Sequence, residues 1–211
     1  MKKLLFFFTV IFLGTTVYAQ QDPEAKKILD KLSEKTKSHK TISAEFKVTF
    51  QNIKDNIQNT SEGSIIIKSD KYVLKFMGNE SYFNGVSLWS YLPDVNEVNI
   101  SEPEPDDEDI FNNPRQLFTI YESNYKYQLI NLENEFAIVD LYPTNLNEDF
   151  SRIRLQINTE KYFLSSATIF GKDGSHYTIE IKNYETNKDF DDSFFEFTPD
   201  NYPDIEIIDL R

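Results

Sequence analysis

The chain has 211 residues, of which 35 are acidic and 22 are basic, giving a formal net charge of −13 at pH 7. It contains no cysteine, which excludes disulfide frameworks, thiolate metal sites, thiol nucleophiles and a lipid-anchoring cysteine. Nucleic-acid binding is disfavoured as well, because neutralising phosphates requires clustered Lys and Arg. Aromatic residues make up 15% of the chain, which indicates a folded domain, since disordered segments contain few of them.

Residues 1–19 have the pattern of a secretory signal peptide. Two lysines precede the apolar run Leu4–Leu13, and the small residues Val17 and Ala19 suit a cleavage site. The apolar run is about half the ~20 residues that a membrane-spanning helix needs. We therefore predict export with cleavage after Ala19, and a single domain over residues 20–211. Loss of the two lysines lowers the formal charge from −13 to −15.

One helix is predicted before a long series of strands. Asp22–Lys40 begins with Asp-Pro, a good helix start, and carries apolar residues at helical spacing. After it the apolar period changes to two, which is typical of half-buried strands. We expect about eleven short strands in a mainly β (α+β) fold, with an antiparallel sheet curled into a barrel or half-barrel. The predicted strands include 42–50, 64–68, 72–77, 82–92 as a hairpin with a type I′ turn at Asn84-Gly85, 95–100, 125–132, 135–142, 152–157, 162–170, 176–184, 194–197 and 205–208.

The strand pattern is interrupted between residues 101 and 122. Glu102–Asp109 is rich in carboxylates and contains two prolines, which favours a solvated, extended loop. Ile110–Glu122 is rich in large apolar residues and is predicted to be a helix that Pro114 splits or starts. Such a segment is either a lid across the barrel mouth or a plug that fills the core, and composition favours neither.

The residues expected of an active site are missing from the sequence. There is no Gly-x-Ser-x-Gly elbow and no glycine-rich phosphate loop, and the two histidines, His39 and His176, fit structural positions. We therefore predict a binding protein rather than an enzyme, with no cofactor and no metal. One alternative is an exported hydrolase that uses an unrecognised pair of carboxylates, since carboxylates are abundant. An acidic surface also supplies such pairs by chance, so their presence does not outweigh the binding interpretation.

Several motifs in order resemble the outer-membrane lipoprotein carrier (LolA) family. The stretch Asn84–Pro93 resembles the family's Asp-Gly-x-x-Leu-Trp-x-Tyr-x-Pro segment, and Ser43–Phe46 resembles its Ala-x-Phe first strand. The strand Gly63–Lys68 comes between them, and Phe194–Pro199 is similar to the family's Phe-x-Phe-x-Pro ending. One departure is clear, because Ser69 and Asp70 stand where well-studied members have an Arg-Pro pair whose Arg helps to hold the lid.

The resemblance implies an unclosed antiparallel β-barrel with helices covering its mouth. It also implies a periplasmic carrier that shields the acyl chains of triacylated lipoproteins and moves them from the inner to the outer membrane. Its partners would be an inner-membrane lipoprotein-releasing transporter and an outer-membrane receptor, and we expect the carrier to be a monomer. A second reading of the same fold is a periplasmic sensor or regulatory domain that binds a lipid or a protein.

On this reading, residues 110–122 become a lid rather than a plug. The predicted lid side chains are Phe111, Leu117, Phe118 and Tyr121. Core packing is the alternative role for each of these lid residues and for each predicted acyl-binding residue. Either the Leu88 or the Trp89 face must point away from the ligand. The predicted acyl-binding side chains are Phe46, Val48, Phe50, Ile65, Ile67, Tyr72, Leu74, Phe76, Leu88, Trp89 and Tyr91.

Overall fold

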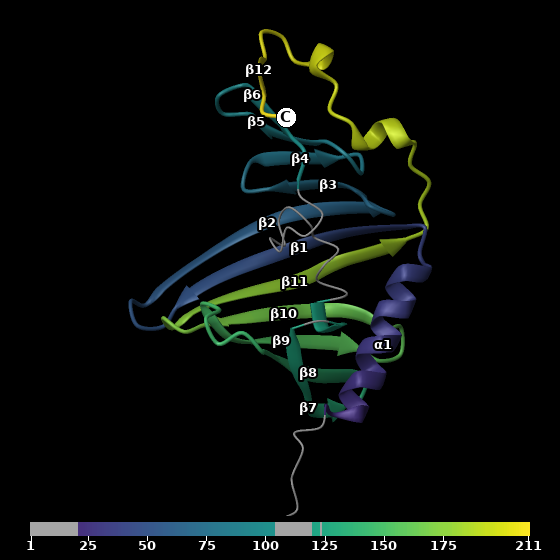
Figure 1. Cartoon of the computed structure of the whole chain (residues 1–211), viewed down its shortest axis with the longest axis vertical. Helices are drawn as coiled ribbons and strands as arrows, with labels where there is room; N and C mark the ends of the chain where they lie inside the picture. Colours follow the sequence, from purple (N-terminus) through teal and green to yellow (C-terminus); the bar gives the residue numbers. More distant parts are fainter. Residues whose placement is uncertain (1–20, 104–119, 123) are drawn as a thin grey trace, which may run out of the picture.

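The structure, a computed structural model, describes residues 21–103, 120–122 and 124–211. Within these residues, twelve strands form one sheet in the order β12-β6-β5-β4-β3-β2-β1-β11-β10-β9-β8-β7 (Figure 1). Every neighbouring pair is antiparallel except β12, which runs parallel to β6. The strands are β1 (Thr41–Asn52), β2 (Ile57–Lys68), β3 (Lys71–Phe76), β4 (Asn79–Phe83), β5 (Leu88–Leu92), β6 (Glu97–Ser101), β7 (Tyr125–Glu133), β8 (Phe136–Pro143), β9 (Phe150–Asn158), β10 (Phe163–Gly171), β11 (Ser175–Thr186) and β12 (Glu206–Asp209).

The sheet does not close into a barrel. The strands β12 and β7 lie at opposite ends of the strand order and far apart in space (Figure 1). The predicted mainly β fold with an unclosed antiparallel sheet is therefore confirmed. In the described part of the chain, one α-helix, α1 (Pro23–Ser38), covers part of one face of this sheet.

The helix α1 is fixed at its start by a side chain that also binds the sheet edge. One Asp22 carboxylate oxygen accepts hydrogen bonds from the Glu24 and Ala25 N–H groups at 3.0 and 3.2 Å. The other oxygen accepts from the Leu129 N–H of β7 at 2.9 Å, and this bond is the main reason that the pKa of Asp22 is lowered. Asp22 thus caps the start of the helix and places it against the outermost strand, β7.

Paired residues of neighbouring strands share one face of a sheet, so the register assigns each side chain to a face. On the first face, α1 packs over β7–β10 in a core that contains Leu29, Leu141 and Ile153, all at most 2% exposed. A second cluster lies on the same face over β11, β1, β2, β3, β4 and β5. A third cluster, with Tyr91 and Phe197, lies on the opposite face of β4–β6.

A glycine sets the packing in the middle of the second cluster. Gly63 pairs with Phe46 on β1 and with Phe76 on β3, and the two phenyl rings meet at a centroid distance of 5.6 Å. A methyl group on Gly63 would lie 2.6 Å from the Phe46 ring and 2.7 Å from the carbonyl oxygen of Lys75. The missing side chain therefore makes room for the ring of Phe46.

Residues 190–205, which we call the C-terminal strap, run along the opposite face before β12 begins. Phe195 and Phe197 anchor the strap, with exposures of 0% and 5%. Its start is held at the β2–β3 turn, where Asp192 accepts from Lys68 and Lys71, each at 2.8 Å. These two ammonium groups lower the pKa of Asp192 to about 2 from its usual 3.8.

Three local predictions are corrected by the structure. Residues 194–197 do not form a strand, because the short 3-10 helix η3 (Asp192–Phe195) occupies the start of this segment. The Asn84-Gly85 turn is not type I′, since only Gly85 has positive φ; the Asn84 side chain instead accepts from the Val86 and Ser87 N–H groups. The strand predicted at 64–68 begins at Ile57.

We predict that Asp192→Asn loosens the C-terminal strap. A carboxyl group whose pKa is lowered by folding stabilises the folded form above its unfolded pKa, and this contribution disappears as the pH falls through the folded value. Acidification of the wild-type protein from pH 5 to about pH 2 should therefore have the same local effect as the substitution. Hydrogen exchange of peptides within residues 195–209 measures it.

The neighbouring Asp191→Asn provides the control, because the Asp191 side chain makes no capping hydrogen bond. Equal protection of the strap in both variants at neutral pH would show that the two lysines do not hold it.

We also predict that Gly63→Ala destabilises the protein by about 1–3 kcal/mol, because the added methyl group must displace the Phe46 ring or the β3 backbone. Urea denaturation measures the change in the free energy of unfolding. Ser64→Ala is the matched control, since Ser64 lies on the other face of the same strand. An unchanged midpoint for Gly63→Ala would contradict the close approach at this position.

Candidate functional site

The candidate site is the part of the first face that α1 does not cover, and we call it the open apolar face. Its buried members are Ile42, Phe46, Ile67, Tyr72, Leu74 and Leu88. Partly buried side chains complete it at the surface: Val48, Ile65, Phe76, Phe83, Ile179, Ile181 and Tyr184. Partly buried aliphatic and aromatic groups in one continuous cluster suit a binding surface for an apolar molecule.

Straight rows of paired residues build this face. One row runs from Ile42 through Ile67, Tyr72 and Phe83 to Leu88, across five strands. The Tyr72 and Phe83 rings in this row lie 5.4 Å apart. Because each pair is set by backbone hydrogen bonds, the sheet holds the row in place without help from a ligand.

The face ends in an exposed aromatic pair. Phe50 of β1 and Tyr177 of β11 are paired in register, and their ring centroids lie 5.0 Å apart. Tyr177 is 45% exposed, so the face meets solvent at this end. Burial raises the pKa of Tyr184, farther along the same strand, to about 12, which keeps its hydroxyl neutral.

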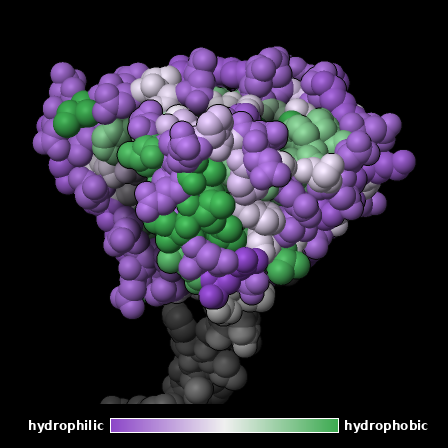
Figure 2. All heavy atoms as spheres, turned by 90° about the horizontal axis from the view of Figure 1, so that it is seen from above, coloured by the Kyte–Doolittle hydropathy of each residue, from purple (hydrophilic) through white to green (hydrophobic). Residues whose placement is uncertain are grey.

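The end of the sheet at β12 also presents apolar groups. Seen from there, a compact hydrophobic patch interrupts a mostly hydrophilic surface (Figure 2). Exposed apolar residues on the strands and turns of this end include Val86 and Leu210, both 64% exposed. Continuing the β12–β6 register by one residue puts Leu210 on the same face as Leu88.

The structure separates the predicted acyl-binding residues into two groups. Nine of the eleven, all except Trp89 and Tyr91, lie on the first face. Leu88 and Trp89 are adjacent on β5 and point to opposite faces, so the register decides the point that the sequence left open. Trp89 and Tyr91 pack with the strap, and the Tyr91 ring lies 5.2 Å from that of Phe197.

Five members of the open apolar face were not identified from the sequence. A period-two reading would have found Ile179 and Ile181, since they alternate with polar residues on β11. Ile42 and Phe83 follow from their register with Ile67 and Tyr72. A bulge opposite Glu45 and Phe46 shifts the alternation of β11, and for this reason Tyr184 joins the face.

Of the predicted lid residues, Phe111, Leu117 and Phe118 lie outside the described residues. Tyr121 belongs to the core under α1, where it is 7% exposed, and its hydroxyl donates to Asp30 at 3.3 Å. Mainly because of burial, the pKa of Tyr121 is raised to about 12.

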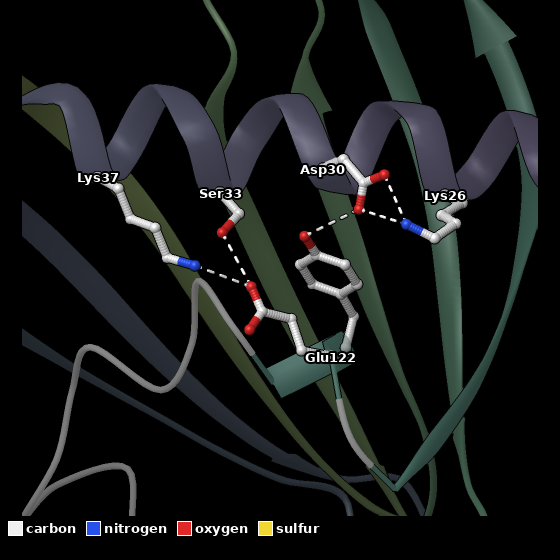
Figure 3. Close-up of polar contacts among 6 residues, drawn as sticks. Lys26, Asp30, Ser33, Lys37 and Glu122 are labelled. Atoms are coloured by element: carbon white, nitrogen blue, oxygen red, sulfur yellow. Dashed lines mark hydrogen bonds and ion pairs between the residues drawn. The ribbon is translucent and has the colours of Figure 1, made fainter.

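The residue after Tyr121 is also held by α1. Glu122 accepts hydrogen bonds from Ser33 and Lys37 of α1 at 3.2 and 3.0 Å (Figure 3). Tyr121 and Glu122 belong to the short 3-10 helix η2 (Ile120–Glu122), which directly precedes β7 in the chain. These contacts fix η2 to the covered half of the first face, beside the open apolar face rather than on it.

At Ser69 and Asp70, the positions of the family's Arg-Pro pair, the chain makes a tight turn. Ser69 has a φ of 54° and its hydroxyl donates to Asp70 at 2.6 Å. The flanking residues Lys68 and Lys71 bind Asp192 of the strap. This corner of the sheet is therefore tied to the C-terminal segment.

A hollow of about 520 Å³ near Gly63 is a weaker candidate for an apolar ligand. Charged side chains line much of it, among them Glu62, Lys182 and the ion pair of Lys75 with Glu80 at 2.9 Å. Removing such groups from water is costly, so an acyl chain would bind there less well than on the open apolar face. Within the described ranges, no group of three or more acidic or histidine side chains could hold a metal ion.

Comparison with known proteins places the chain in a family. The model of the outer membrane lipoprotein carrier protein LolA matches residues 37–198. No curated protein sequence matches the chain. No helix in the described ranges is long and apolar enough to cross a membrane.

Solved structures of similar fold have low sequence identity. An uncharacterised conserved protein from Thermus thermophilus has a TM-score of 0.58 and 12% identity, over 88% of this chain and 99% of that one. A LolA superfamily protein from Nitrosomonas europaea has a TM-score of 0.42 and 12% identity, over 82% and 97%. The MucA/MucB complex of Pseudomonas aeruginosa contains a chain with a TM-score of 0.40 and 10% identity, over 83% and 61%.

The open sheet, the helix α1 on one of its faces and the match over residues 37–198 agree with one another, and the chain belongs to the LolA family of outer membrane lipoprotein carrier proteins.

Proposed function

We propose that this protein binds the acyl chains of lipoproteins on the open apolar face and carries them from the inner to the outer membrane. The observation that carries the proposal is that half of one sheet face is apolar and continuous yet has no helix over it among the described residues. Family membership supports the same role. The protein acts by binding and release, without catalysis.

The energetics of such binding need no specific polar contact. Burying one methylene is worth about 0.8 kcal/mol, so roughly fifteen methylenes would contribute at most about 12 kcal/mol. The rows of the open apolar face present mainly hydrocarbon, including Val48, Ile65 and Phe76. Affinity therefore follows the buried length of the chain, and different lipoproteins can share one carrier.

The proposal assigns the protein to the periplasm as an exported monomer. Its cargo is triacylated lipoproteins, its donor is an inner-membrane lipoprotein-releasing transporter, and an outer-membrane receptor is the acceptor. The formal charge, which falls from −13 to −15 when residues 1–19 are removed, keeps a protein with an apolar surface soluble.

We expect Val48→Glu to weaken binding of a synthetic triacylated cysteine peptide by at least about tenfold, because a carboxylate would lose its hydration against the acyl chain. Thr49→Glu is the control, since it adds the same charge to the opposite face of the same strand. Native mass spectrometry of the protein co-expressed with a tagged lipoprotein, together with titration of the peptide, measures the difference. We expect a 1:1 complex for wild type and Thr49→Glu and its loss for Val48→Glu.

Equal binding by the two variants would exclude the open apolar face as the acyl site. Capture of a protein that carries no acyl chain would instead support the sensor or regulatory alternative. Absence of any lipid or lipoprotein from the purified wild-type protein would count against carriage.

Export is tested separately. We expect the protein recovered from the periplasm to begin at Gln20, because Val17 and Ala19 suit signal peptidase. The intact mass of the secreted chain, compared with that of an Ala19→Arg variant that blocks cleavage, decides the point. A secreted chain that retains residues 1–19 would contradict it.

A further inference from the structure

A row of cationic and aromatic side chains crosses the face opposite α1. We call it the cation–aromatic row, and it contains Lys126, Tyr142, Arg152, Phe170 and His176 from β7 to β11. Register pairs Lys126 with Tyr142, Arg152 with Phe170, and Phe170 with His176. Tyr142 and Arg152 each lie one residue beyond the Leu141–Ile153 pair. Leu141 and Ile153 belong to the core under α1, so the row points away from it.

Asp140 and Arg154 form the next pair along β8 and β9, beside the cation–aromatic row. The single carboxylate of Asp140 can neutralise only one of the two arginines, Arg152 and Arg154. Asp140, 2% exposed, accepts two hydrogen bonds from Arg154, at 2.7 and 2.8 Å, and one from the Tyr142 hydroxyl at 3.3 Å. Arg152 approaches the same carboxylate with its Nε at 3.4 Å, a nitrogen that makes no hydrogen bond within the described residues. Asp140 therefore carries one negative charge beside two guanidinium groups, and its two short hydrogen bonds go to Arg154. The pair of arginines keeps one positive charge in excess.

The Arg152 guanidinium is held in an orientation that suits an anion. Its Cζ lies 3.8 Å from the centroid of the Phe170 ring, so the planar group stacks on the ring. Nε points toward Asp140, and the Arg152 side chain is 31% exposed. Among the described residues, its two terminal nitrogens donate no hydrogen bond. The guanidinium therefore offers an outer edge with two parallel N–H groups, the arrangement that binds a carboxylate.

The spacing along the row defines the ligand further. Lys126 and His176 each lie two strands away from Arg152, on opposite sides, which is about 10 Å at the usual strand separation. Lys126 is exposed and forms no ion pair within the described part of the chain. In a polyproline II helix, side chains three residues apart point the same way and are separated by about 9 Å. Acidic residues at every third position of such a segment would lie opposite Lys126, Arg152 and the imidazole of His176, whose ring N–H can donate a hydrogen bond to a carboxylate.

We propose that the cation–aromatic row is a docking site for an extended acidic segment of a partner protein, with one carboxylate bound to the outer edge of Arg152. Charge complementarity supports this occupant, since the row is cationic on a chain of formal charge −13. A phospholipid bilayer fits less well, because an anionic membrane would repel the rest of the molecule. Tyr142, next to Arg152 in the row, adds an aromatic group that can contact a proline ring between the acidic residues.

The test uses the full-length mature protein and two labelled peptides of equal charge. One has the sequence Glu-Pro-Pro-Glu-Pro-Pro-Glu, and the other, Glu-Pro-Glu-Pro-Glu-Pro-Pro, has its acids at every second position. We expect the first to bind more tightly by fluorescence anisotropy and to shift the amide signals of β9 and β10 in an NMR titration. Arg152→Gln should weaken its binding by about tenfold, as expected for the loss of a charge-assisted pair.

Lys161→Gln is the matched control, since it removes the same charge from an exposed turn between β9 and β10. Its affinity for the first peptide should stay within about twofold of the wild-type value. Thermal unfolding of both variants checks that each remains folded. Equal loss in the two variants, no preference between the peptides, or no peptide binding at all would overturn the proposal. Binding to phosphatidylglycerol vesicles that depends on Arg152, without peptide binding, would assign the row to a membrane instead.

Discussion

The structure depends on how one large sheet is covered. A sheet of this width has two broad faces, and the described residues supply a single α-helix and a C-terminal strap to cover them. The helix shields β7–β10 on the first face, and the strap shields β4–β6 on the opposite face. The two covers are thus placed diagonally. The parts left over are the open apolar face on one side and the cation–aromatic row on the other.

Polar contacts attach each of the two covers to a defined place in the fold. Asp22 joins the first turn of α1 to β7, and Glu122 joins η2 to Ser33 and Lys37 of the same helix. On the other side, Asp192 ties the strap to the β2–β3 turn. The exposed ion pairs among these contacts, those of Glu122 and Asp192 with lysines, contribute little to global stability. Their effect is positional, because each fixes one end of a cover.

Much of the site was predictable from the alternation of apolar and polar residues. Phe46, Val48 and Phe50 share a face on any strand that includes them, and β3 follows the same rule. Alternation could not choose between Leu88 and Trp89, because both faces of β5 carry apolar side chains and both residues are large. That choice depends on register with β4, a long-range property that local periodicity does not contain.

Other parts of the fold were hidden for identifiable reasons. The first half of β2 is polar, with Gln58, Asn59 and Thr60, yet it is a strand because it pairs with the long strand β1. Backbone hydrogen bonds to β1 hold this half of the strand, and its side chains are not buried. Its apolar pattern therefore does not indicate a strand. The segment Phe194–Phe197 reads as a strand by composition. Phe195 and Phe197 are instead the buried side chains of the strap, and the 3-10 turn of η3 orients the first of them.

The separation of the two exposed surfaces has a consequence for how the protein could work. A ligand on the open apolar face contacts side chains such as Ile179 of β11, whereas a partner on the cation–aromatic row contacts the other face of that strand, at His176. The two therefore do not compete for the same atoms. The paired backbone of β11 lies between them, and its register with β1 and β10 holds both surfaces at a fixed distance. Under the proposed function, a partner can therefore bind one surface while an acyl chain occupies the other, so that docking and release are separate events.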